Sequence, residues 1–204
     1  MNRAFTLAEV LITLGIIGVV AAMTMPALVA EHQKKVAATR LEKFYSIMSQ
    51  AVIRWEAEEG IIPEDFKFDS SIIKNGENNR VWFDETIGKY IQHESIKNNL
   101  SSGDYFDVKL NDGSGFVAYV ERSTVMNFFY CTQYKYCGAE KYDGRRTFLF
   151  TLTNGKFMTS QSSYNNMTRE ELLNRCKNAK KPGRHACTRL IQVDGWRIAK
   201  DYPW

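Results

Sequence analysis

The sequence predicts an α+β protein in which a long N-terminal helix packs on a C-terminal domain of antiparallel strands. Two features favour this class. Residues 5–59 follow a helical pattern that is apolar in its first half and amphipathic in its second. Short alternating segments with Gly-rich turns between them follow after residue 105, as is typical of hairpins. The chain has 204 residues, of which 44% are apolar, which suits one domain beyond the first helix.

The first half of the helix is long and apolar enough to cross a bilayer. A spanning helix needs roughly 20 apolar residues, and no charge occurs from Val10 to Ala30. Glu9 lies one turn inside the apolar run that begins at Phe5. Insertion of a carboxylate into a membrane costs free energy, and a cationic partner there would offset that cost. Glu9 is therefore predicted to be functional.

These residues match a known pattern. The run Ala4-Phe5-Thr6-Leu7-Ala8-Glu9, followed by an apolar helix with Pro26, resembles the class III signal of type IV pilins and type II secretion pseudopilins. The resemblance implies that prepilin peptidase cuts between Ala4 and Phe5 and that the new Phe5 amine is N-methylated. It also implies that Glu9 meets the terminal amine of a neighbouring subunit during assembly. That family usually has Gly before the cut, where this chain has the similarly small Ala4.

The resemblance also sets the expected organisation. Residues 1–4 are the leader, 5–30 the transmembrane and assembly helix, and 31–204 an extracytoplasmic pilin-like domain. Pro26 should kink the helix, and Gly18 to Pro26 matches a stretch that can melt when related filaments assemble. The protein is therefore expected to cross the bacterial cytoplasmic membrane once, with its C-terminal domain in the periplasm or outside the cell.

Two other interpretations of the N-terminus compete with this one. A secretory signal peptide would have a shorter apolar core and a small-x-small site, but Leu28 occupies a position where that site needs a small residue. A plain signal anchor is the other alternative. Charge does not decide the orientation, because Arg3 precedes the span while Lys34 and Lys35 follow it.

Residues 31–59 predict the amphipathic half of the helix. Apolar side chains recur at spacings of three and four, and Gly60 is a plausible stop. The apolar stripe consists of Ala37, Leu41, Phe44, Met48, Ala51 or Val52, and Trp55.

The rest of the chain is expected to be mainly β from residue 105 to 204. Hairpins are predicted for 105–121, around Asn111–Gly115, and for 147–160, with Asn154-Gly155 at the tip. Loops are expected at 75–79 and 98–102, with a short helix near 84–92. A second short helix should begin at Thr168, with Glu171 completing a capping box. Asp194-Gly195 is predicted to form a turn between short extended segments.

Four cysteines in an extracytoplasmic domain predict two disulfides. Proximity favours Cys131–Cys137 and Cys176–Cys187, although four cysteines allow three connectivities. A metal site is the alternative, but the spacings are not those of C-x2-C pairs.

The sequence offers little for catalysis. Its three histidines lie far apart, and it has no zinc-protease motif, nucleotide-binding glycine pattern or nucleophile elbow. We therefore expect no enzyme, no cofactor and no metal. The net charge of +4 is mild and implies little about partners.

One basic segment suggests a nucleic-acid partner. Lys177, Lys180, Lys181 and Arg184 lie inside the predicted Cys176–Cys187 loop and could follow DNA phosphates. Tyr130, Tyr134 and Tyr136 could add stacking. The competing and more ordinary interpretation is a solvated loop.

The predicted function is that of a structural subunit of a type IV pilus or a type II secretion pseudopilus. Its expected partners are other pilin or pseudopilin subunits, prepilin peptidase and the cytoplasmic membrane. The alternatives are a DNA-binding minor pilin of a DNA-uptake machine and a membrane-tethered domain that never polymerises.

Overall fold

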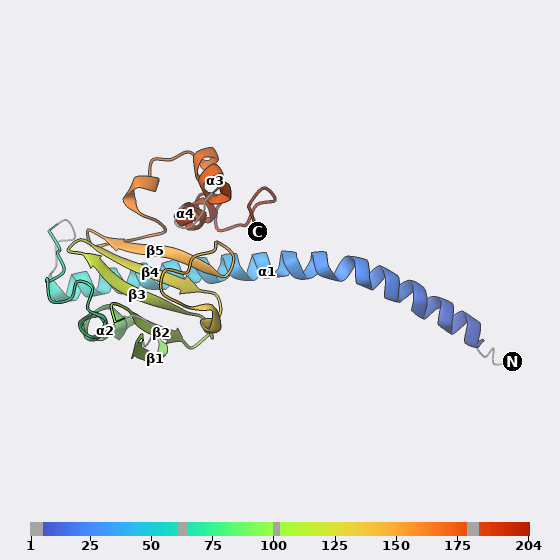
Figure 1. Ribbon diagram of the computed structural model, residues 1–204, viewed down its shortest axis with the longest axis horizontal. Helices are drawn as coiled ribbons and strands as arrows, with labels where there is room; N and C mark the ends of the chain where they lie inside the picture. The colour runs from blue at the N-terminus through green and yellow to red at the C-terminus, as the bar shows by residue number, and fades with distance from the viewer. Residues whose placement is uncertain (1–5, 61–64, 100–102, 179–183) are drawn as a thin grey trace. The chain divides into compact units, whose positions relative to one another are not determined.

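The computed structural model describes residues 6–60, 65–99, 103–178 and 184–204 (Figure 1). The chain divides into two compact units, of which the first ends at Val36 and the second begins at Ala37. Helix α1 (Leu7–Glu59) contributes to both.

The first unit consists of the N-terminal part of α1. The helix continues through Gly18 and Pro26 without interruption. The hydroxyls of Thr13 and Thr24 donate to the carbonyls of Glu9 and Val20, both at 2.9 Å, so these polar side chains are satisfied by the helix itself. From Val10 to Ala30 the surface of the helix is therefore almost wholly apolar.

The second unit contains the rest of α1, a six-stranded sheet and several short helices. The strands follow the order β1-β2-β3-β4-β5-β6, and every neighbouring pair is antiparallel. The strands are β1 (His93–Asn98), β2 (Phe106–Leu110), β3 (Gly115–Arg122), β4 (Val125–Cys131), β5 (Thr147–Thr153) and β6 (Lys156–Met158). The helices are α2 (Gly76–Glu85), α3 (Arg169–Asn178) and α4 (His185–Val193), with 3-10 turns η1 (Ile87–Tyr90), η2 (Tyr134–Tyr136) and η3 (Ser162–Tyr164).

The main core lies between α1 and one face of the sheet. Phe44 is at its centre, with its ring centroid 4.3 Å from that of Tyr130, 5.0 Å from Phe150 and 5.5 Å from Phe116. The whole predicted stripe of α1 is buried, which confirms the amphipathic half of the helix. The α+β class and the packing of the long helix on an antiparallel sheet are likewise confirmed.

The opposite face of the sheet is covered as well. Tyr105, Val117, Phe129 and Leu149 form a second, smaller apolar cluster there. Strand β4 is buried at every position because it has a covered face on each side. A strand buried on both faces lacks the alternation that marks a half-exposed strand, which is why β4 was not predicted.

The Asn-rich segment at 75–79 is not a loop, and this prediction was wrong. Asn75 caps α2, because its side chain accepts a hydrogen bond from the amide of Asn78 at 3.1 Å. Asn79 is buried and donates to the carbonyl of Asp104 at 3.1 Å. The helix predicted near 84–92 is divided between the end of α2 and η1. The polar edge strand β1 was also missed.

The strands of the region predicted to be mainly β end at Met158, and the described residues after it contain the helices α3 and α4. The segment predicted to be extended before Asp194 is α4, whose Cys187, Leu190 and Ile191 are buried at helical spacing. The predicted capping box of α3 is confirmed. The Thr168 amide donates to the Glu171 carboxylate at 2.7 Å, and the Glu171 amide donates to the Thr168 hydroxyl at 3.3 Å.

The turn predicted at Asp194-Gly195 ends α4. Gly195 has a φ of 67° and Trp196 a φ of 56°, and the Trp196 amide donates to the carbonyl of Ile191 at 2.9 Å. The indole of Trp196 then packs 5.3 Å from the ring of Tyr45 on α1. Arg169 holds the turn from α3 through two hydrogen bonds to Asp194, at 2.5 and 2.9 Å.

Candidate functional site

The chemistry expected at the N-terminus depends on Glu9, which lies in the first turn of α1. The Glu9 carboxylate accepts hydrogen bonds from the amide of Thr6 at 2.9 Å and from its hydroxyl at 2.8 Å. The Glu9 amide is 3.3 Å from the Thr6 hydroxyl in return. This reciprocal pair is a capping box, which satisfies orphan donors at the start of a helix.

The capping box assigns a role to Thr6 that the sequence analysis missed, although the T-x-x-E spacing was visible. In the single subunit the carboxylate of Glu9 has a local partner, and both bonds reach the same oxygen, Oε2. The other carboxylate oxygen, Oε1, accepts neither of these two bonds. Ala4 and Phe5, the predicted cleavage and methylation residues, lie outside the described residues.

Glu9 is surrounded by exposed apolar side chains. Leu7 is 80% exposed, and large apolar residues remain uncovered as far as Val29. Among the described helices, α1 is the one whose length and composition allow it to cross a membrane. Exposed apolar surface of this extent is a docking surface for lipid or for other apolar helices.

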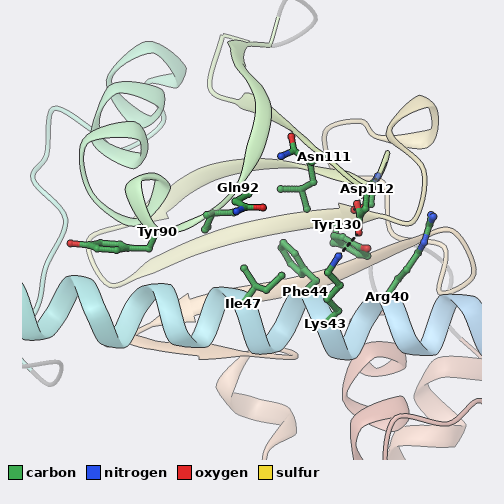
Figure 2. A pocket seen from close by; sticks show the side chains of 12 residues that line it. Arg40, Lys43, Phe44, Ile47, Tyr90, Gln92, Asn111, Asp112 and Tyr130 are labelled. Carbon is green, nitrogen blue, oxygen red and sulfur yellow. Dashed lines mark hydrogen bonds and ion pairs between the residues drawn. The ribbon is translucent and has the colours of Figure 1, made fainter.

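A second candidate site is a hollow of about 310 Å³ in the second unit, here called the helix groove (Figure 2). It lies between α1 and the turn that joins β2 to β3. Phe44, Ile47 and Leu110 supply apolar walls, and polar groups gather at one end. Figure 2 shows Lys43 of α1 reaching Asp112 of the turn, at 3.3 Å.

The polar end of the helix groove positions the β2–β3 turn. Burial alone would raise the pKa of Asp112, but hydrogen bonds from Ser114 and Lys43 lower it below its ordinary value. Arg40, one turn before Lys43, donates to the carbonyl of Thr132. Burial raises the pKa of Tyr130, so its hydroxyl stays neutral. The groove thus holds a charged clamp between helix and turn, and neither histidine nor cysteine lines it.

The predicted basic loop is only partly described. Lys180 and Lys181 lie outside the described residues. Lys177 is on α3, and Arg184 donates to the carbonyl of Asp143. Tyr130 is 1% exposed, so its predicted stacking on a base was wrong.

All four cysteines are paired. One disulfide joins Cys131, at the end of β4, to Cys137 just after η2, and the other joins Cys176 of α3 to Cys187 of α4. The second bridge therefore connects two helices, where a long basic loop had been expected.

Comparison with known proteins identifies both parts of the chain. Residues 1–25 match the prokaryotic N-terminal methylation motif, the signal of proteins processed by prepilin peptidase. Residues 27–204 match a family of unknown function, DUF6613. No curated protein and no solved structure matches the chain. The chain is a type IV pilin-like protein with a prepilin-type signal and a long apolar N-terminal helix, and it belongs to the DUF6613 family.

Proposed function

We propose that the chain is a structural subunit of a type IV pilus or a type II secretion pseudopilus that assembles through α1. The observation that carries this proposal is Glu9, a carboxylate at the start of a helix whose apolar surface has no cover within its own unit. In a filament, neighbouring helices would cover that surface. The incoming N-terminal amine, whose ordinary pKa is about 7.7–8.0, would supply the cation that Glu9 lacks.

The same proposal places the protein in the cytoplasmic membrane before assembly, with residues after the apolar run on the extracytoplasmic side. The two disulfides fit an oxidising compartment. A non-enzymatic role is part of the proposal.

Substitution of Glu9 tests the proposal. Glu9→Val should leave membrane insertion and processing intact but reduce incorporation into sheared filaments at least roughly tenfold, because the lost carboxylate no longer meets the neighbouring amine. Thr13→Val is the matched control, since it also replaces a polar side chain in the apolar run with Val. Immunoblots of sheared and membrane fractions give the two amounts.

The outcomes separate the alternatives. Equal incorporation of Glu9→Val and wild type contradicts the amine pairing. Absence of the wild-type chain from the sheared fraction, with the chain retained in membranes, favours the membrane-tethered domain that never polymerises. The mass of the mature N-terminus tests processing, because cleavage after Ala4 should produce a chain that begins with methylated Phe5.

The DNA-binding alternative has narrower support. Of its four proposed cations, Arg184 already donates to a backbone carbonyl. A gel shift of the full chain in detergent with duplex DNA at low salt tests it, since non-specific phosphate contacts are strongest there.

A further inference from the structure

The face of the sheet opposite α1 carries a run of aromatic rings. The centroids of Tyr105 and Tyr119 are 4.5 Å apart, those of Tyr119 and Phe129 6.2 Å, and those of Phe129 and Tyr142 5.7 Å. His185 of α4 continues the run, 4.6 Å from Tyr142. The rings come from two strands, two loop segments and a helix that are far apart in the sequence.

A hollow of about 230 Å³ opens beside these rings, here called the outer hollow. The rings of Tyr119, Phe129 and Tyr142 line it together with the carboxylates of Glu121 and Glu140. Its volume is below the roughly 300–1,000 Å³ of pockets for drug-sized ligands. The outer hollow therefore suits a small molecule or the end of one side chain.

The two carboxylates supply negative charge that the described residues do not neutralise. Glu121 accepts a hydrogen bond from the Asn127 amide at 3.0 Å, and Glu140 accepts one from the Tyr105 hydroxyl at 3.2 Å. Neither forms an ion pair within the described part of the chain. Burial raises the pKa of Tyr119, and the charges of both carboxylates raise it further, so both act on the same ring.

Asn127 lines the outer hollow and has a buried acceptor without a partner among the described residues. Its residue is 5% exposed, and its Oδ1 has no hydrogen-bond partner among the described residues. The orientation of the amide is determined by its neighbours, because the group that faces the Glu121 carboxylate must be the Nδ2 donor. A buried acceptor without a donor is unusual in folded proteins, and this one belongs to a side chain that lines the outer hollow.

We propose that the outer hollow is a binding site for an organic cation, an ammonium or guanidinium group on an alkyl chain. Aromatic faces attract such a cation through the ring quadrupole, and desolvation strengthens that attraction. The carboxylates of Glu121 and Glu140 balance its charge. A metal ion fits less well, because the described residues hold no group of three His, Cys, Asp or Glu side chains with suitable spacing.

Titration of the full-length chain in detergent micelles tests the site. Leu149 lines the outer hollow, so its ¹³C-labelled methyl groups report on occupancy. We expect n-butylammonium and n-butylguanidinium to produce a saturable shift of these methyl resonances, and n-butanol, which has the same chain without the charge, to produce none.

Matched variants make the test specific. Glu121→Gln and Glu140→Gln should each weaken cation binding roughly threefold to tenfold, because each removes one charge while keeping a hydrogen-bond acceptor. Glu85→Gln, an exposed acid on α2, should leave the affinity unchanged. Tyr142→Leu should weaken binding, and Tyr142→Phe should retain it, since only the ring face is required.

Several results would overturn the proposal. These are no saturable shift with either cation, an equal response to butanol, or unchanged affinity in both glutamate variants. Carbodiimide cross-linking in producing cells then identifies the source of the cation. A cross-link from Glu121 or Glu140 to a lysine of a second copy indicates a neighbouring subunit, whereas cation binding without such a cross-link indicates a free amine.

Discussion

The two halves of α1 have similar apolar side chains in opposite environments. In the first half, Leu14 is 60% exposed and Ile17 is 64% exposed. In the second half, Leu41 and Met48 are fully buried and Phe44 is 3% exposed. The helical backbone is the same in both, so the difference comes from what each half contacts.

The distribution of polar residues around the helix explains this contrast. The second half keeps its apolar residues on one stripe and its charges on the remaining face, so a single sheet can cover it. The first half is apolar on all sides, and one sheet could not cover it. A helix that is apolar on all sides needs lipid or several neighbouring helices around it. A membrane would supply the first before assembly, and the proposed filament would supply the second.

The contrast between the two halves predicts that the largest loss of stability follows from a substitution at Phe44. Phe44→Ala should lower the free energy of unfolding by about 3–5 kcal/mol, because it leaves a cavity among Phe116, Tyr130 and Phe150. Leu14→Ala, in the first half, should change it by less than about 0.5 kcal/mol. Denaturant unfolding of the full chain in detergent, followed by near-ultraviolet circular dichroism, measures both.

A comparable loss of stability in Phe44→Ala and Leu14→Ala would contradict this contrast, because it would mean that the first half also packs within the folded domain. The Phe44→Leu variant is a control for cavity size. It should lose less than Phe44→Ala, since Leu refills part of the space.

The sequence predicted the structure well where a segment follows a simple helical or strand period. The stripe of α1 and the hairpin around Asn111–Gly115 were predictable, because each pairs a clear period with a turn or stop signal. Strand β4 was not predictable, because both of its faces are covered and it shows no alternation. Helix α4 was missed because Asp194-Gly195 resembles a turn between strands, whereas it ends a helix.

One of the candidate sites could be predicted from the sequence, and another could be found only in the folded structure. Glu9 could be found in the sequence, because a single charge in a long apolar run is visible without a fold. The outer hollow could not be found, because Glu121, Glu140 and His185 come from a strand, a loop and a helix. Only the fold of the second unit brings such residues together.

Both disulfides lie in the second unit, so their removal should affect that unit alone. Removing the Cys176–Cys187 bridge with a double Ser substitution should cost about 2–3 kcal/mol in unfolding free energy, because the bridge restricts the unfolded chain. The Cys131–Cys137 bridge closes a shorter loop and should contribute slightly less. Membrane insertion of the first unit should not change.

Non-reducing peptide mapping of chain purified from the host provides the reference for these variants. It should yield the two pairs Cys131–Cys137 and Cys176–Cys187. Four free thiols in that material would contradict both the pairing and the expected oxidising compartment.

The smallest expected effect concerns two histidines, one in each unit. Burial lowers the pKa of His185 below its ordinary value of about 6.5, and the charge of Glu121 partly opposes this shift. The unfolded chain therefore binds more protons than the folded one between the two pKa values. His185 therefore does not lower the free energy of unfolding above about pH 6.5, and that free energy falls as the pH drops from there through the folded pKa.

The His185→Gln variant should lose this part of the pH dependence. His32→Gln, at an exposed position on α1, should retain it. The difference is measured from the unfolding free energies at about pH 7.5 and about pH 5, which lie on either side of the ordinary histidine pKa of about 6.5. If the His185→Gln chain loses as much stability in acid as wild type, the buried ring is not the cause. The acid sensitivity would then come from carboxylates such as Asp143. Hydrogen bonds lower the pKa of Asp143, although burial opposes that shift.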